Sequence, residues 1–201
     1  MPEKSPFLRD GLERTRLRAG ATARRATLDL PTLSAEITGR IAVMPEFLAA
    51  RIVLLYLALP GEVNVEALAT VNDRTFLAPR CASEGRLTLH RYVPGVTPLV
   101  RGPFGIREPD PAGAPEAEAS SVDLVIVPAL LLSEQGDRLG YGGGYYDRLL
   151  PTLRPDCVRL GALPEALIVP MLPVQPWDMP VQIVVTEARI RRPEGRMLTT
   201  P

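Results

Sequence analysis

The sequence has few of the residues that mark several common classes of protein. It contains two cysteines, one histidine and one tryptophan among 201 residues. Cys81 and Cys157 are far apart and form no CxxC pair, which argues against a disulfide framework or a cysteine-rich zinc site. We therefore expect reduced, partly buried thiols in a cytoplasmic protein. His90 lies in a predicted edge strand with no partner in view, so no Ser-His-Asp or Cys-His set is indicated.

Net charge and long apolar runs are also missing. The 23 basic and 23 acidic residues cancel, and the pI is near 6.6. This balance argues against nucleic acid as the main partner, because binding to phosphate backbones needs excess positive charge. No stretch approaches the roughly 20 apolar residues that span a bilayer, and the first residues lack the apolar core of a signal peptide. We expect a monomer that binds small molecules, without nucleic acid or membrane partners.

The pattern of apolar residues predicts alternating helices and strands. Helices are expected over residues 8–29 and 32–50, with Pro31 ending the first, and a short helix over 64–70. The apolar run 51–59 is typical of a central strand that is covered on both faces. Further strands are expected at 74–79, 85–90, 122–127, 157–161 and 181–186. The prediction is an α/β fold: three layers, with a Rossmann-like, mostly parallel sheet flanked by helices, as one domain over 1–190 with a polar tail over 191–201.

Two other segments are distinctive. In the first predicted helix, Arg14, Arg18 and Arg25 share one face. This face is either solvated or supplies cations to a bound phosphate group. Residues 94–120 form a long loop rich in Pro, Gly and Ala, and a loop of this length is usually functional or disordered. The part before Pro111 is a candidate to cover a ligand, and 111–120 is interpreted as flexible filler.

The most specific stretch is Arg138-Leu139-Gly140-Tyr141-Gly142-Gly143-Gly144-Tyr145-Tyr146-Asp147-Arg148. It follows a buried strand and precedes a predicted helix start, an order that gathers backbone N–H groups around a phosphate. It matches neither the Walker A loop nor the dinucleotide fingerprint. A tight structural turn is the alternative, since glycines also serve where φ is positive. Arg138 and Arg148, as phosphate contacts, and Asp147, as a magnesium ligand, favour a nucleotide loop.

This stretch resembles the signature of the 5-formyltetrahydrofolate cyclo-ligase family. The resemblance extends over most of the chain, through the strand ending before Glu62, the segment Phe104–Pro109 and the loop Leu172–Asp178. It implies an enzyme that uses ATP and Mg²⁺ to convert 5-formyltetrahydrofolate to 5,10-methenyltetrahydrofolate, releasing ADP and phosphate. The formyl oxygen would be phosphorylated, and N10 would then attack the activated carbon. Such chemistry depends mainly on positioning and charge neutralisation.

The resemblance also implies a role for each matching residue. Asp147 and Asp178 would bind magnesium, and Tyr145 and Arg148 would act in catalysis. The reduced folate would contact Leu57, Glu62, Tyr141, Gly142, Gly143, Gly144 and Tyr145. ATP would contact Arg14, Arg18, Arg138, Leu139, Gly140, Tyr141, Gly142, Gly143, Gly144, Tyr145 and Tyr146. By position alone, Glu62 follows a strand end, where open sheets bind ligands, and it also suits a cap for the short helix.

Most of the departures from the family pattern lie near the end of the chain. Gln175-Pro176-Trp177-Asp178 stands where Glu-Pro-His-Asp is common, Leu167 replaces a glutamine, and Val65 a threonine. Arg14 replaces a lysine, which keeps the charge. We expect the Trp177 ring to close over the core rather than stack on a ligand. Two alternatives stay open: a divergent paralogue that acts on another formyl or amide substrate, and a non-catalytic regulator that binds a nucleotide or folate.

Overall fold

The computed structural model describes residues 6–70 and 73–193 of the chain, and within that part the main sheet has eight strands. In chain order they are β1 (Ile52–Leu54), β2 (Thr75–Cys81), β3 (Leu87–Arg91), β6 (Glu116–Ala117), β7 (Leu124–Val127), β10 (Val158–Ala162), β12 (Ile183–Val185) and β13 (Ile190–Arg191). Their order across the sheet is β13-β12-β10-β7-β1-β2-β3-β6. The five strands from β12 to β2 are parallel, while β13 pairs antiparallel with β12, β3 with β2, and β6 with β3.

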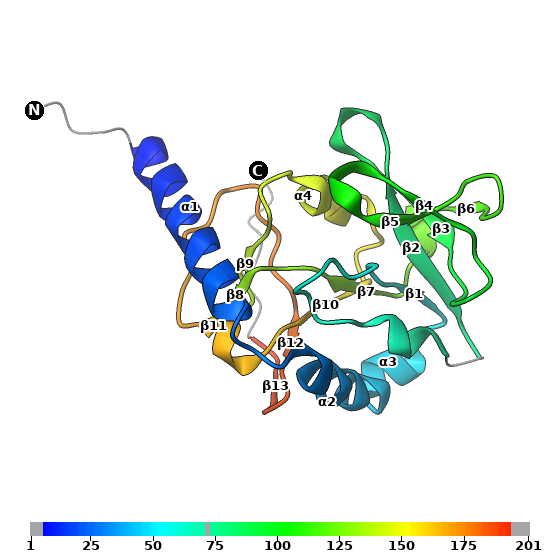
Figure 1. Ribbon diagram of the computed structural model, residues 1–201, viewed down its shortest axis with the longest axis horizontal. Helices are drawn as coiled ribbons and strands as arrows, with labels where there is room; N and C mark the ends of the chain where they lie inside the picture. The colour runs from blue at the N-terminus through cyan, green and yellow to red at the C-terminus, as the bar shows by residue number, and fades with distance from the viewer. Residues whose placement is uncertain (1–5, 71–72, 194–201) are drawn as a thin grey trace, which may run out of the picture.

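Apolar side chains alternate between the two faces of this sheet. Leu124 and Ile126 of β7 join one buried core, and Val125 and Val127 join the other. Helices α2 (Leu30–Ala42) and α3 (Pro45–Ala49) cover the first face. The second face is covered by α4 (Tyr145–Leu149) and the turn η5 (Leu150–Thr152), on the side opposite α2 and α3 in Figure 1. The predicted layered, mostly parallel α/β fold is confirmed.

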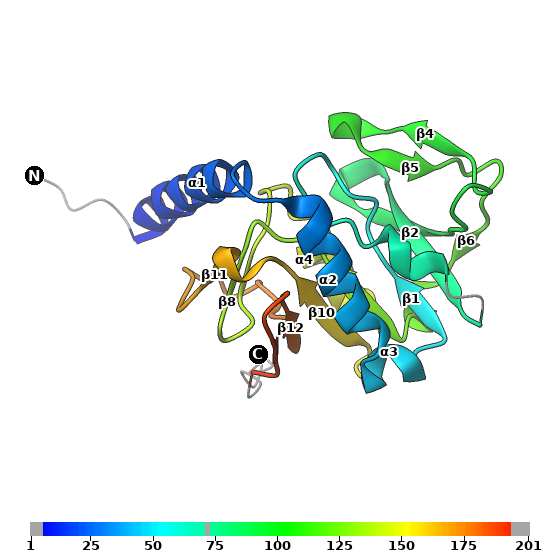
Figure 2. The ribbon, with the colours of Figure 1, turned by 60° about the horizontal axis from the view of Figure 1, so that its bottom comes forward.

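Two smaller sheets and a long helix complete the architecture. Strands β8 (Leu131–Ser133), β9 (Arg138–Leu139) and β11 (Ile168–Val169) form one small sheet, and β4 (Leu99–Arg101) pairs with β5 (Arg107–Pro109) in a hairpin. Helix α1 (Pro6–Arg25) extends past β8 and β11 in Figure 2. The remaining short turns are η1 (Glu66–Thr70), η2 (Ser83–Gly85), η3 (Pro103–Gly105), η4 (Ala119–Ser121) and η6 (Glu165–Leu167).

Several predicted boundaries were wrong. The helix expected over 32–50 is two helices, because the chain turns at Val43 and Met44 before Pro45. Pro31 lies in the first turn of α2, where proline is tolerated, and α1 ends earlier, at Arg25. Of the predicted strand 51–59, only Ile52–Leu54 is a strand. The short helix expected over 64–70 is the 3₁₀ turn η1.

The segment interpreted as filler also has a defined structure. Its strand β6 pairs with β3 and forms the sheet edge, so β3 is an inner strand. His90, on β3, is buried: its Nδ1–H donates to the Ala114 carbonyl at 2.9 Å, and its Nε2 is hydrogen-bonded with the Thr88 hydroxyl at 3.0 Å. The histidine therefore has a structural role, consistent with the expectation that it has no catalytic one.

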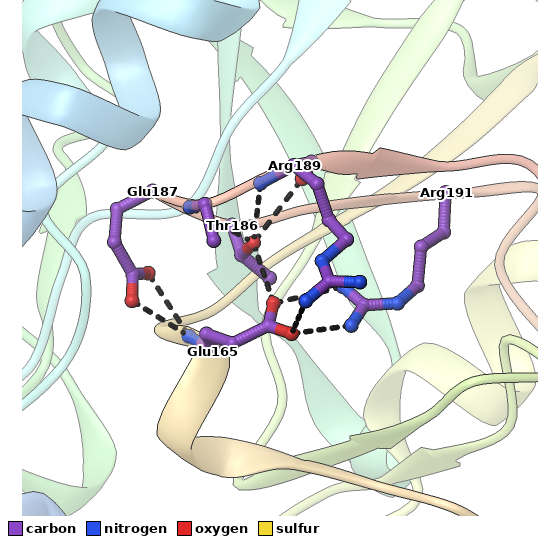
Figure 3. Close-up of polar contacts among 6 residues, drawn as sticks. Glu165, Thr186, Glu187, Arg189 and Arg191 are labelled. Atoms are coloured by element: carbon purple, nitrogen blue, oxygen red, sulfur yellow. Dashed lines mark hydrogen bonds and ion pairs between the residues drawn. The ribbon is translucent and has the colours of Figure 1, made fainter.

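A polar cluster fixes the far edge of the sheet, where β12 turns into β13 (Figure 3). The Glu165 carboxylate accepts from Arg191 and from the buried Thr186 hydroxyl, which lies 2.8 Å away. Glu187 in turn accepts from the backbone N–H of Glu165. The first residue of the predicted polar tail, Arg191, is therefore part of the sheet, and residues 194–201 lie outside the described part. The single domain over 1–190 stays a prediction.

Both cysteines are free, as expected, with Cys157 buried and Cys81 partly buried. Among the described helices, none combines the length and the apolar character needed to cross a membrane.

Candidate functional site

The predicted site residues come together around one cavity of about 710 Å³. Its walls come from α1, the carboxyl end of β1 and the loop after it, the β4–β5 hairpin, the glycine loop (residues 140–144) and the loop 172–178. Of the sixteen residues predicted for the site, all but Leu139 and Arg148 line it. Leu139 is fully buried in the core. A second cavity of about 670 Å³ lies against α1, β8 and β11 and contains none of the predicted residues.

The glycine loop needs its glycines. Gly142 and Gly144 have φ of +100° and +67°, which favours glycine. A Cβ atom on Gly140 would lie 2.7 Å from the Arg138 guanidinium, and one on Gly143 would lie 2.9 Å from the Tyr145 ring. The loop can therefore approach side chains, or a ligand, more closely than any other residue type would permit.

Two arginines hold this loop by its carbonyl groups. Arg18 Nε donates to the Gly140 carbonyl at 2.9 Å. Arg148 donates to the Gly143 carbonyl at 2.7 Å and to the Gly85 carbonyl at 2.8 Å, and its guanidinium lies 5.6 Å from the centre of the Tyr145 ring. Arg148 thus braces the loop from outside the cavity, and its predicted catalytic role remains a prediction. Because α4 has five residues, its dipole contributes little, and arginine side chains supply the positive charge.

One end of the cavity carries a charged cluster of Arg14, Arg18, Arg138, Asp147 and Asp178. Arg14 pairs with Asp178, with 2.6 Å between Nη1 and Oδ2, and Arg138 pairs with Asp147. Burial lowers the pKa of Arg138, and the two aspartates oppose this effect. Three cations face two anions, so the cluster has an excess of positive charge.

This cluster has the groups that a nucleotide phosphate and its magnesium ion require. The buried Nε of Arg138 has no hydrogen-bond partner among the described residues, so a donor is ready for an anion. The same part of the chain contains no group of three or more metal-ligating side chains. Two aspartates without a third ligand suit Mg²⁺, which binds through one or two carboxylates together with substrate phosphates.

At the other end of the cavity, a chain of hydrogen bonds links the buried Arg25 and Glu62 through the partly exposed Tyr141. Arg25 donates to the Tyr141 hydroxyl at 2.7 Å, and this hydroxyl donates to Glu62 Oε1 at 2.5 Å. The second carboxylate oxygen of Glu62 accepts from the Leu59 N–H at 2.8 Å, so Glu62 does not cap the following turn. Burial and the nearby Glu62 raise the pKa of Tyr141, so this tyrosine stays protonated at neutral pH.

Arg25 was assigned by sequence to the face that contains Arg14 and Arg18, and its role differs from theirs. It lies seven residues beyond Arg18, about 10 Å further along the helix. It is buried, and it also donates to the Ala129 carbonyl at 2.7 Å. One face of α1 therefore serves both ends of the cavity. The helical spacing indicated the shared face, and only the tertiary structure separates the two roles.

The hairpin lies in the segment before Pro111 that was a candidate to cover a ligand, and it does line the cavity, whereas Pro79 and Cys81 of β2 were missed as part of the wall. Glu108 is almost fully buried; its Oε1 accepts from the Cys81 N–H at 3.1 Å, and its Oε2 lies 3.6 Å from Arg80. Burial, together with Glu108, raises the pKa of Cys81 to about 11, so this thiol is not a thiolate nucleophile at neutral pH. Phe104, at the hairpin tip, contacts the Tyr145 ring edge-on, with 6.4 Å between ring centres. The hairpin therefore reaches the glycine loop.

The departures from the family pattern fall in two places. Val65 and Leu167 are fully buried in the core and do not line the cavity. Gln175 and Trp177 do line it. The expectation that Trp177 closes over the core was wrong, because its side chain is 61% exposed on the cavity wall. The proline-rich loop runs over the surface there, and its backbone path could not be deduced from composition.

Comparisons with known proteins show the family of the chain. The model of the 5-formyltetrahydrofolate cyclo-ligase family matches residues 3–187. The 5-formyltetrahydrofolate cyclo-ligase of Escherichia coli strain K12 is 31% identical over 157 residues, which covers 75% of this chain and 86% of that protein. The structure of 5,10-methenyltetrahydrofolate synthetase from Aquifex aeolicus superposes with a TM-score of 0.78 at 30% identity and covers 93% of this chain and 96% of that one.

A second synthetase structure, from Mycoplasma pneumoniae, shares the fold with a TM-score of 0.70 at 17% identity, covering 87% of this chain and 99% of that one. The family match spans nearly the whole chain, and the E. coli and A. aeolicus proteins are similar over most of their own lengths. The chain therefore belongs to the 5-formyltetrahydrofolate cyclo-ligase family.

Proposed function

We propose that the chain converts 5-formyltetrahydrofolate to 5,10-methenyltetrahydrofolate in an ATP- and magnesium-dependent reaction that releases ADP and phosphate. The observation that carries this proposal is that one cavity has two chemically different ends. A cationic cluster with two aspartates lies at one end, and a buried carboxylate, Glu62, lies at the other. The glycine loop lies between them and contacts both, through Arg18 and through Tyr141.

In this proposal the cationic end holds the ATP phosphates. Arg14, Arg18 and Arg138 contact phosphate oxygens, and the unpartnered Nε of Arg138 supplies a donor. Asp147 and Asp178 hold magnesium, which supplies charge neutralisation on the phosphate oxygens when it is bound. Each of these aspartates now neutralises an arginine, so both pairs would loosen when the nucleotide arrives.

The other end holds the reduced folate. Glu62 is an anionic acceptor for N–H groups of the pterin ring, beside the apolar wall of Leu57. The Arg25–Tyr141 pair fixes the orientation of this carboxylate. The formyl oxygen attacks the γ-phosphorus of ATP and ADP leaves; N10 then attacks the activated formyl carbon, and the departing phosphate carries away the formyl oxygen. The proposed catalytic residues are Tyr145, on the cavity wall, and Arg148, which braces the loop.

We test the proposal by incubating the purified chain with 5-formyltetrahydrofolate and Mg-ATP and recording the near-ultraviolet absorbance of the methenyl product. The absorbance should rise in step with ADP release. If ATP binds and no methenyl product forms, the assignment of the folate substrate fails.

The second candidate is a divergent paralogue that acts on another formyl or amide substrate. Gln175 and Trp177 favour it, because they replace the common residues of the family on the cavity wall itself. It predicts ADP release that is triggered by a different metabolite and not by 5-formyltetrahydrofolate. A regulator without catalysis would show thermal stabilisation by ligand and no ADP release with either substrate. In each case we propose a cytoplasmic monomer.

A further inference from the structure

Trp177 is the one tryptophan of the chain, and it lines the main cavity with a side chain that is 61% exposed. A ring with this exposure contributes little to the core, so core packing does not account for it. We infer that Trp177 is a nucleotide-binding residue that stacks on the base of ATP. This inference rests on the proposed function, because it requires ATP to bind in this cavity.

The anchoring of the loop places Trp177 at the cationic end. Its neighbour Asp178 has an oxygen, Oδ2, that accepts from Arg14 at 2.6 Å and from the backbone N–H of Gln175 at 2.9 Å. Arg14 Nη1 also donates to the Pro173 carbonyl, 3.3 Å away. These bonds tie the segment before and after Trp177 to α1. A base joined through its ribose to phosphates at Arg14 and Arg138 has to lie beside this end.

The cavity wall is open next to α1. Gly11 lies three residues before Arg14, on the same face of the helix, and it also lines the cavity. A Cβ atom added to Gly11 would meet no atom within 4 Å. At this point of the wall, the helix surface therefore faces open space.

Among the described residues, two other exposed aromatic side chains line the cavity, and both are weaker candidates for the base. Tyr141 donates to Glu62 at the proposed folate end. The second is Phe104. It packs edge-on against Tyr145, on the part of the glycine loop that is proposed to border the folate. Trp177 is anchored instead to the Arg14–Asp178 pair. Stacking tolerates any base, because each has a π face. The expected preference is thus for a nucleoside triphosphate over a bare triphosphate, with little discrimination between adenine and guanine.

Calorimetric binding of Mg-ATP and of magnesium tripolyphosphate to the full chain tests this inference. The substitution Trp177→Ala should lower the affinity for ATP about 5- to 150-fold, which is the loss expected when one base–aromatic stack is removed. The affinity for tripolyphosphate should stay within about twofold of the wild-type value. Trp177→Phe should restore most of the ATP affinity. Met171→Ala is the matched control, since Met171 is 79% exposed in the same part of the chain and does not line the cavity. ATP should also change the tryptophan emission of the wild type, and tripolyphosphate should not.

The inference is overturned if Trp177→Ala binds ATP as tightly as the wild type, or if its affinities for ATP and for tripolyphosphate fall by the same factor. It is also overturned if the substitution weakens binding of 5-formyltetrahydrofolate and leaves ATP unchanged, because the ring would then contact the folate. These results leave the proposed function standing. If the wild type does not bind Mg-ATP at all, the proposed function fails together with the inference.

Discussion

Replacing Asp147 by asparagine separates its structural role from its proposed metal-binding role. Asp147 pairs with Arg138, and the two side chains are 22% and 7% exposed. Loss of one partner from a buried ion pair costs about 3–5 kcal/mol. Asp147 is partly exposed and Asp178 still acts on Arg138, so we expect about 2 kcal/mol of lost stability. Because a metal ligand is also lost, turnover should fall at least about 100-fold and need more magnesium to recover.

Urea unfolding and turnover measured across a magnesium titration check both effects. In the Asp147→Asn background, the further change Arg138→Met removes the uncompensated charge, so stability should return to within about 1 kcal/mol of the wild type. Asp156→Asn is the control: Asp156 pairs with Arg154 outside the cavity and is 72% exposed, so turnover should not change. Wild-type turnover and magnesium dependence in Asp147→Asn would refute the metal assignment. Failure of the double variant to regain stability would refute the charge argument.

Three further predictions concern single residues. Arg138→Ala should lower the affinity for ATP about 10- to 100-fold, because charge-assisted hydrogen bonds are lost, and should lower the affinity for folate much less. Equal losses of the two affinities in calorimetry would show that Arg138 does not contact the phosphates. Tyr141→Phe removes the hydroxyl that donates to Glu62, so the KM for folate should rise about threefold to tenfold while that for ATP stays constant, and the reverse pattern in steady-state kinetics would contradict this placement. Hydrogen bonds from Arg191 lower the pKa of Glu165 to about 2, from an ordinary value of 4.5, so its stabilisation is present above about pH 4.5 and is lost as the pH falls toward 2. Glu165→Gln should therefore lower the free energy of unfolding by roughly 1–2 kcal/mol at pH 7, allowing for partial exposure, and by less in unfolding curves measured in acid. A loss that does not depend on pH would show that the charge of the Glu165 carboxylate is not what stabilises the fold.

The sequence was most informative where one contiguous segment carries both pattern and chemistry. The run 122–127 is apolar at every position except Asp123, and its apolar side chains join the cores on both faces, so a buried parallel strand was predictable there. The glycine loop was predictable because its glycines and charged flanks are adjacent in the chain. The small sheet formed by β8, β9 and β11 was not, since strands of two or three residues have no usable periodicity.

Side-chain direction was the main feature that the sequence did not contain. Leu139 and Arg148 belong to the glycine-loop motif, yet one points into the core and the other binds backbone carbonyls outside the cavity. Arg25 has the spacing of a phosphate contact and instead supports Glu62 through Tyr141. Trp177 was expected in the core because large aromatic rings are usually buried. In each case the outcome depends on how distant segments pack, and helical or strand periodicity does not encode this.

The cyclisation assay, run with and without Mg-ATP, is the most direct test of the proposed reaction. We expect the methenyl absorbance to develop when Mg-ATP and 5-formyltetrahydrofolate are both present, with one ADP released for each methenyl product. We expect no product when ATP or magnesium is left out, and a strongly reduced rate for Asp147→Asn. Methenyl product that forms at the same rate without ATP, or ATP hydrolysis that does not depend on the folate, would refute the proposed reaction.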